Sequence, residues 1–220
     1  MKKLLSLLII ASLTPAVLIG CGSSEETAST TQTEEAAETS TEKAASEKDD
    51  KLTKDWFLFT AEDGTYSVKF PGEPKVQEHS TQVKVGELDE DVTDINLKMV
   101  VYEGSASKQA YLTTHAKYPV DPSQYNAEEG LNAARNGVEN NANVTITSEE
   151  KIDYEGLPGR ELVTTIPSQE GEGELTQRIR MFIDPEGPTL YQAVVITDEG
   201  DVNSPEADAF FNSWEIAKNE

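Results

Sequence analysis

From residue 56 onward, apolar residues recur mostly at every second position, which is the spacing of half-buried β-strands. Tyr66, Val68 and Phe70 alternate with polar residues, and residues 95–102 repeat the pattern. The other predicted strands are 56–59, 76–85, 110–118, 144–154, 159–166, 174–183 and 190–197. Turn-forming sequences such as Asp-Pro-Glu-Gly at 184–187 separate most of these segments and support the assignment.

The predicted strands at 56–59 and 190–197 contain unbroken apolar runs. Residues 56–59 are Trp-Phe-Leu-Phe, and residues 193–196 are Ala-Val-Val-Ile. Such runs are typical of strands that are covered on both faces. We therefore expect both to be buried and 193–196 to be central, although so short a run as 56–59 could also be a buried turn of helix. The more polar segment 76–85 is predicted to be an edge strand.

The period changes to that of a helix between residues 121 and 141. Asn126 with Glu129 three residues later indicates a capped helix start. One face of this helix carries Ala127, Leu131, Ala134 and Val138. Ser204 followed by Pro205 predicts the start of a second helix, which runs toward residue 214.

These elements predict one α+β domain at residues 53–220. Its strands follow one another in meander order and would form a large antiparallel sheet of about seven strands. Helices before and after the last strands would flank the sheet and give an α/β/α sandwich.

An apolar run at residues 4–19 follows Lys2 and Lys3 and ends in Leu-Ile-Gly-Cys at 18–21. It is shorter than the ~20 apolar residues of a membrane-spanning helix. An ordinary secretory signal would need an A-x-A-like cleavage site and would leave Cys21 as an odd thiol. The segment resembles a bacterial lipobox, which implies a signal peptide at 1–20 and acyl chains such as palmitate on Cys21. The chain would then be anchored to the cell membrane, facing the extracytoplasmic side.

Residues 21–52 have the composition of a tether. From 22 to 51 the chain contains no aromatic residue and no Val, Ile or Leu, and is rich in Ser, Thr, Glu and Ala. Such a segment cannot bury enough apolar surface to become ordered. A surface helix at 34–45 is the alternative, but it would have no apolar stripe with which to dock. We therefore expect a disordered acidic linker.

The charge of the chain limits its partners. The formal net charge is −23, and residues 52–220 contain 13 Lys and Arg against 32 Asp and Glu, a formal charge of −19. This argues against nucleic-acid binding, which depends on cationic groups. It favours a basic or divalent-cation partner, although solubility alone is a simpler explanation.

Catalytic signatures are not apparent in the sequence, and we predict a protein that is not an enzyme. No P-loop, G-x-S-x-G, H-E-x-x-H or G-x-G-x-x-G motif occurs. His79 and His115 are the only histidines, and both are predicted to be isolated surface residues. No resident cofactor is expected.

Two acidic segments are the candidate calcium sites. Asp89, Asp91 and Asp94 lie in one predicted turn, and Asp198 and Asp201 precede the last helix. Carboxylates are the oxygen ligands that Ca²⁺ prefers. A solvated turn is the alternative for the first segment, and helix capping with a favourable dipole contact is the alternative for the second.

Arg160, Arg178 and Arg180 are three of the four arginines in the chain. If their strands are neighbours, they could form a basic site for a carboxylate or phosphate. The alternative is cross-strand pairing with residues such as Glu161 or Glu174.

Several segments resemble the PsbP-like proteins, a set of exported domains. They are Tyr-Ser-Val-Lys-Phe-Pro-Gly-Glu-Pro at 66–74, Tyr-Glu-Gly-Leu-Pro-Gly-Arg-Glu at 154–161, and the segments 178–182, 190–193 and 204–214. The resemblance implies an antiparallel sheet between helical layers. It also implies action by protein binding, as in the photosystem II subunit PsbP and the Ran-binding MOG protein.

The expected function is a non-catalytic protein-interaction or assembly module at the bacterial cell envelope. The alternative is an extracytoplasmic binder of a small ligand, either a divalent cation such as calcium or an anion. An exposed apolar surface would favour the first, and a pocket with converging polar groups would favour the second.

Overall fold

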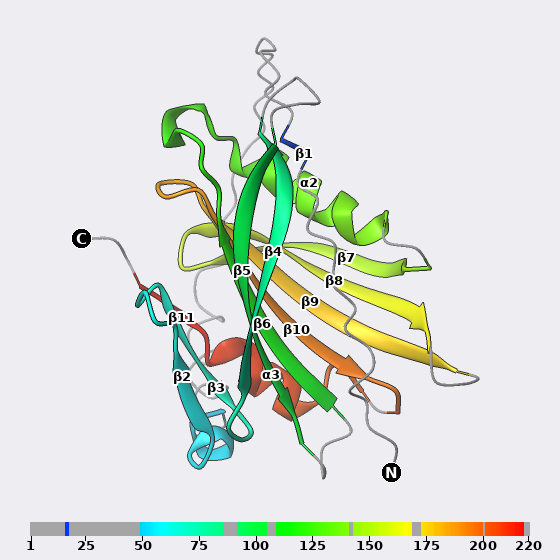
Figure 1. The fold of residues 1–220 in the computed structure, drawn as a ribbon. Helices are drawn as coiled ribbons and strands as arrows, with labels where there is room; N and C mark the ends of the chain where they lie inside the picture. Colours follow the sequence, from blue (N-terminus) through cyan, green and yellow to red (C-terminus); the bar gives the residue numbers. More distant parts are fainter. Residues whose placement is uncertain are drawn as a thin grey trace, which may run out of the picture.

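A computed structural model describes residues 16–17, 49–85, 92–104, 109–140, 143–168, 173–199 and 201–217 (Figure 1). Side chains are described for the same residues except 16–17 and 79–96. The predicted signal peptide (1–20) and linker (21–52) therefore lie outside the described residues, apart from 16–17 and 49–52. A helical turn at 49–53 leads into the domain.

Seven antiparallel strands form the large sheet, which confirms the predicted α+β class. In spatial order they are β4 (Lys75–Val85), β5 (Val92–Glu103), β6 (Gln109–Lys117), β10 (Thr189–Thr197), β9 (Glu174–Asp184), β8 (Leu157–Pro167) and β7 (Thr145–Tyr154). The dipeptide β1 (Ala16–Val17) pairs in parallel with the outer edge of β4. Apart from this dipeptide, β4 has the edge position that its polarity predicts.

The prediction of a simple meander is wrong at one point. β6 pairs with β10 rather than with β7, so two meanders, β4–β6 and β7–β10, are joined side by side. The chain between β6 and β7 contains the 3₁₀ turn η2 (Pro122–Gln124) and the helix α2 (Ala127–Glu139). This connection carries the chain over one face of the sheet to its far edge, where β7 begins (Figure 1).

Helix α2 covers one face of the large sheet. As predicted, Asn126 is its N-cap, and the Asn126 side chain accepts hydrogen bonds from the backbone N–H groups of Glu128 and Glu129. Leu131, Ala134 and Val138 are buried against the sheet with residues such as Leu162, Met181 and Ile183. The amphipathic pattern therefore identified the correct face of this helix.

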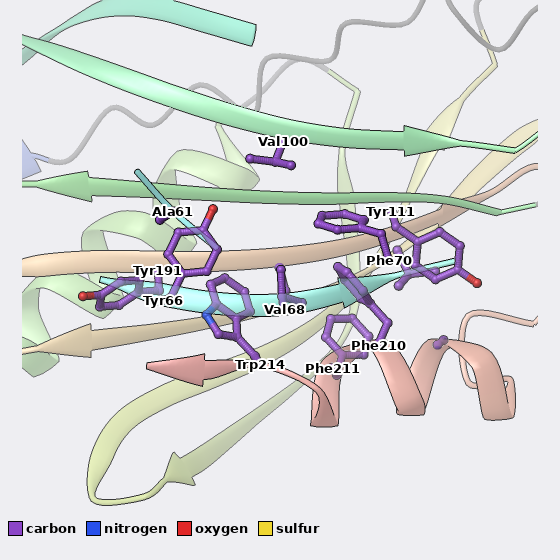
Figure 2. Close-up of a cluster of buried hydrophobic side chains, with 13 residues drawn as sticks. Ala61, Tyr66, Val68, Phe70, Val100, Tyr111, Tyr191, Phe210, Phe211 and Trp214 are labelled. Carbon is purple, nitrogen blue, oxygen red and sulfur yellow. The ribbon is translucent and has the colours of Figure 1, made fainter. Parts of the chain in front are cut away.

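The opposite face of the sheet is covered by a second layer, of which the sequence predicted the helix but not the small sheet. This layer combines helix α3 (Pro205–Asn212) with a small sheet ordered β11 (Glu215–Ile216), β3 (Tyr66–Phe70) and β2 (Phe57–Thr60). Ser204 caps α3, and Pro205 occupies its first turn, as predicted. Figure 2 shows the cluster between the layers, to which β3 contributes Tyr66, Val68 and Phe70.

Strand β10 confirms the prediction of a central strand that is covered on both faces. Leu190 and Val194 point into the core under α2, whereas Tyr191, Ala193 and Val195 point into the core under the small sheet. The apolar run at 193–196 therefore supplies two different cores with alternate residues.

Strand β2 contradicts the same prediction. It lies at the outer edge of the small sheet, where 41% of Phe57 and 58% of Leu58 is exposed. Trp56, just before the strand, and Phe59 pack against the buried cluster, whereas Phe57 and Leu58 between them do not. The apolar run at 56–59 therefore marks an exposed apolar edge and not a covered strand.

The cluster in Figure 2 gives a test of this arrangement. Phe210 of α3 is fully buried, and its ring centroid lies 5.3 Å from that of Phe70 and 5.1 Å from that of Tyr111. We expect Phe210→Ala to lower the free energy of unfolding by about 3–5 kcal/mol, because the cavity cannot collapse between two layers. Urea unfolding followed by tryptophan fluorescence measures the loss.

The matched control for that experiment is Phe57→Ala, which removes the same ring from the exposed edge. Its expected cost is within about 1 kcal/mol, because the side chain is already in contact with water. Equal losses in the two variants would contradict the placement of β2 at an open edge.

Candidate functional site

The free edge of β2 is the most distinctive surface among the described residues. β3 pairs with β2 on one side, and no described strand lies on the other side. The Ala61 N–H donates to the Tyr66 carbonyl at 2.9 Å, so odd-numbered residues of β2 direct their backbone groups toward β3. By the alternation of an antiparallel ladder, the N–H and C=O groups of Leu58 and Thr60 point outward.

Exposed apolar side chains lie along and beside this edge. Phe57 and Leu58 belong to β2 itself, and Val76 of β4 is 52% exposed. Phe59, Val76 and Val100 together line a cavity of about 60 Å³ between the small sheet and the β4–β5 pair. The edge of β2 therefore borders a shallow apolar groove whose floor is the large sheet.

Charged side chains close one end of the groove. Lys98 of β5 forms a short ion pair with Glu62, and its Nζ lies 3.9 Å from a carboxylate oxygen of Glu78. The hydrogen bond to Glu62 raises the pKa of Lys98. Asp63 follows Glu62 at the same end of the cavity. One lysine is thus surrounded by three carboxylates, and the rim of the groove is acidic.

His115 of β6 lies beneath this end of the groove, and the prediction of an isolated surface histidine is wrong for it. Its side chain is 13% exposed, and its Nε2 lies 3.0 Å from Oδ2 of Asp63 in the β2–β3 turn. The other ring nitrogen, Nδ1, is buried and has no hydrogen-bond partner among the described residues. This favours the tautomer in which Nε2 carries the proton and donates it to Asp63.

The pair formed by His115 and Asp63 joins the two layers of the protein. It ties the turn of the small sheet to the centre of the large sheet, next to the hydrogen bond between the Tyr66 and Thr113 hydroxyls at 3.1 Å. Burial raises the pKa of Tyr66 to about 12, so this hydroxyl is neutral in ordinary conditions. Because His115 Nδ1 points into the protein, the pair resembles a structural latch more than a catalytic dyad. His79 belongs to β4, and its side chain lies outside the described set.

The structure separates the three arginines that were predicted as an anion site. Arg160 lies opposite Met181 on the face covered by α2, and it pairs with Glu128 and Glu149. Arg178 and Arg180 lie on the other face, where both pair with Glu161. Although β8 and β9 are neighbours as required, the sheet itself prevents a common site for the three side chains.

Ion pairing occupies Arg178 and Arg180. Arg178 also contacts Asp208 at 2.6 Å, and both guanidinium groups lie over the ring of Phe211 at 4.9 and 4.8 Å. Partial burial acts to raise the pKa of Glu161, but the hydrogen bonds from Arg180 and Arg178 lower it below its usual value. This is the cross-strand alternative, and the pairing with Glu161 is found as expected.

Of the predicted calcium ligands, only Asp198 and Asp201 have side chains among the described residues. Asp89 and Asp91 lie outside the described residues, as does the side chain of Asp94. Asp198 and Asp201 are exposed, and Asp201 accepts a hydrogen bond from the backbone of Asn203 in the turn before α3. No group of three potential metal ligands occurs in the described part of the chain. Calcium binding stays a prediction.

A second hollow, of about 390 Å³, lies at the opposite end of the small sheet. It is lined by Ile216 and Ala217, by the β7–β8 turn and by the turn that follows β9. The β7–β8 turn has positive φ angles at Glu155 (52°) and Gly156 (89°), as the Glu-Gly sequence predicts for a tight hairpin. The carboxylates of Glu155, Asp184 and Glu186 line this hollow and extend the acidic character of the surface.

Sequence reasoning missed the two central features of the site. To predict the pair of His115 and Asp63, one must know which residue lies above His115, and no local pattern in the sequence contains that information. The open edge had a signal, since 56–59 is short and borders the predicted linker, but an apolar run alone does not distinguish an edge from a covered strand.

Comparison with known proteins gives likenesses in structure only. No family model and no curated protein matches the chain. A protein from Bacteroides thetaiotaomicron is similar at 9% identity and a TM-score of 0.42, covering 73% of this chain. This chain spans about half of that protein, since the match covers 48% of its length.

Two further solved structures are similar over more of their own length. A protein of unknown function from Pseudomonas aeruginosa matches at 10% identity and a TM-score of 0.33, covering 67% of this chain and 85% of that one. Cyanobacterial PsbP from Synechocystis matches at 13% identity and a TM-score of 0.37, covering 73% and 92%. The latter has the fold that the sequence resemblance implied. Similarities of this size carry no information about function.

The latch predicts a specific dependence of stability on pH. Partial burial acts to raise the pKa of Asp63, but hydrogen bonds from Thr65 and His115 lower it below the usual 3.8. A lowered folded-state pKa contributes stability that is present above the unfolded value and is lost as the pH falls through the folded value. We therefore expect Asp63→Asn to be less stable than wild type at pH 6 and equal to it at about pH 2–3.

Urea unfolding at a series of pH values measures this difference. Asp55→Asn is the control, because Asp55 is an exposed carboxylate whose partner is the exposed Lys54. Its unfolding free energy should follow that of wild type across the series. A constant offset between Asp63→Asn and wild type at every pH would show that the carboxylate charge does not act in the latch.

Proposed function

We propose that this chain is a lipid-anchored, non-catalytic protein-interaction module on the extracytoplasmic side of the bacterial cell membrane. The observation that carries the proposal is the open edge of β2, with its outward backbone groups and its exposed side chains Phe57 and Leu58. Exposed apolar surface of this kind marks protein contacts.

An unpaired strand edge is also a structural template for association. Its N–H and C=O groups can accept a further strand, and natural proteins usually protect such edges. In the described part of the chain, no strand pairs with β2 on this side. The groove beside it offers apolar contacts from Phe59 and Val76 to an incoming segment.

Membrane attachment in this proposal rests on Cys21 and not on the domain. None of the described helices has the length and hydropathy to span a membrane. A diacylglyceryl group on Cys21 would bury two acyl chains, which suffices for stable anchoring where one chain does not. The acidic domain would be repelled by anionic headgroups, so the linker would hold it away from the lipid surface.

The small-ligand alternative has less support from the geometry. An anion site would need the three arginines together, and they lie on two faces of the sheet in ion pairs with carboxylates. The geometry therefore favours the interaction module.

Substitution of Cys21 tests the anchor. In the native bacterial host, we expect Cys21→Ala to lose labelling by radioactive palmitate and to move from the membrane pellet to a soluble fraction. A conservative change elsewhere in the linker, Ser40→Ala, should alter neither result. Palmitate incorporation that persists in Cys21→Ala would contradict lipidation at this residue.

Photo-crosslinking in intact membranes tests the interaction itself. A photoreactive phenylalanine analogue at Leu58 should form an adduct with a different protein, because this side chain is exposed at the open edge. The matched control places the same analogue at Glu150, an exposed position of β7 at the far edge of the large sheet. The absence of any adduct from position 58, or equal adducts from both positions, would argue against the proposed function.

A further inference from the structure

We infer that the β2 edge binds an extended segment of a partner protein that presents both an apolar and a cationic side chain to the groove. The segment would pair with β2 as an added strand of the small sheet. This inference rests on the proposed function and adds the chemistry of the partner.

The backbone of β2 sets the conformation of the partner segment. Leu58 and Thr60 direct their N–H and C=O groups away from β3, so the ladder offers four unpaired groups to one more strand. A helix cannot satisfy donors and acceptors in this row, whereas an extended chain can. With four residues in β2, the paired segment would be about four residues long, or roughly 13 Å.

The groove requires an apolar side chain in the partner segment. A strand that adds to β2 lies above β4 and β5, where Val76 and Val100 line the cavity of about 60 Å³ with Phe59. This space accepts the end of one aliphatic side chain. Since successive side chains of a strand point to opposite faces, only every second residue of the partner faces the groove.

The charges set a second groove-facing position, because Val76 and Glu78 are two residues apart in β4 and therefore point to the same side of the sheet. Glu62 and Glu78 are exposed beside the groove, and Lys98 is the one cation among them that lines it. An incoming Lys or Arg would find carboxylates on both sides, whereas an incoming Asp or Glu would be repelled. Complementary charge of this kind selects the partner and accelerates the encounter.

Charge also argues against a second copy of this chain as the occupant. Residues 52–220 have a formal charge of −19. Edge-to-edge pairing of β2 with its own copy would bring two such domains together, with Glu62 and Asp63 of each near the junction. The same acidic surface therefore opposes self-association and favours a basic partner.

Peptide binding to the full lipidated chain in phosphatidylcholine vesicles tests this inference. The probe, called the Lys-Val peptide, is fluorescent and end-blocked and repeats Val-Thr-Lys-Thr, so that Val and Lys lie on one face. The comparison peptide, called the Glu-Val peptide, replaces each Lys by Glu. A third peptide carries the Lys-Val sequence with N-methyl groups on alternate residues, which prevents strand pairing without a change in charge. Fluorescence anisotropy gives the three affinities.

The matched variants are Thr60→Pro and Thr60→Val. Proline removes the outward N–H at this position and leaves the β2–β3 ladder intact, since edge strands tolerate proline where the N–H faces solvent. Valine keeps the N–H. We expect the Lys-Val peptide to bind at least about tenfold more tightly than both other peptides, and Thr60→Pro to weaken it by a similar factor.

Each outcome decides the question. Equal affinity for the Lys-Val and Glu-Val peptides, or full binding of the N-methylated peptide, would overturn the inference. If Thr60→Pro fails to fold by circular dichroism, the N-methylated peptide still decides whether strand pairing occurs. Dimerisation of the wild-type chain that Thr60→Pro abolishes would assign the edge to a second copy. If the analogue at position 58 forms an adduct in membranes but the Lys-Val peptide does not bind, the interaction module remains supported. Only the proposed chemistry of the partner is then wrong.

Discussion

The packing of β3 onto the large sheet is the contact on which the rest of the second layer depends. The small sheet has strands of four, five and two residues, which could not form a stable sheet in water by themselves. Tyr66, Val68 and Phe70 bury one face of β3 completely, and the Trp214 ring lies 5.1 Å from that of Tyr66. Both β2 and β11 are held through β3, so the position of the open edge is fixed from one side only.

This dependence explains why the latch lies where it does. A hairpin attached through a single strand can pivot about that strand, and the pair of Asp63 with His115 fixes the turn end of the hairpin to β6. Lys98 and Glu62 add a second tie at the same end. The polar contacts gather beside the groove because this is the place where the apolar cluster ends and where the hairpin would otherwise move.

The sequence predicted what depends on local periodicity. It located α2 with its N-cap Asn126, α3 with Ser204, and the doubly covered strand β10, because each pattern is complete within one segment. It could not predict that β6 pairs with β10, or that Arg160 and Arg178 lie on opposite faces, because pairing between distant strands decides both. The same limit applies to the partner of His115. For β2, the apolar run is visible in the sequence, but whether other elements pack over it is not. That depends on elements that are distant in the sequence.

An open apolar edge is usually a liability, because identical edges can pair with one another. The described part of this protein has no bulge and no proline in β2, and no described strand pairs with its outer edge. Its protection would instead be the acidic charge of the whole domain, which acts at a distance and against every copy equally. Such protection is selective, because a cationic partner cancels the charge repulsion and a neutral or acidic partner does not. A bulge or a proline does not select by charge in this way. At high salt, screening should weaken both the repulsion between copies and the preference for that partner, so the two effects should fade together.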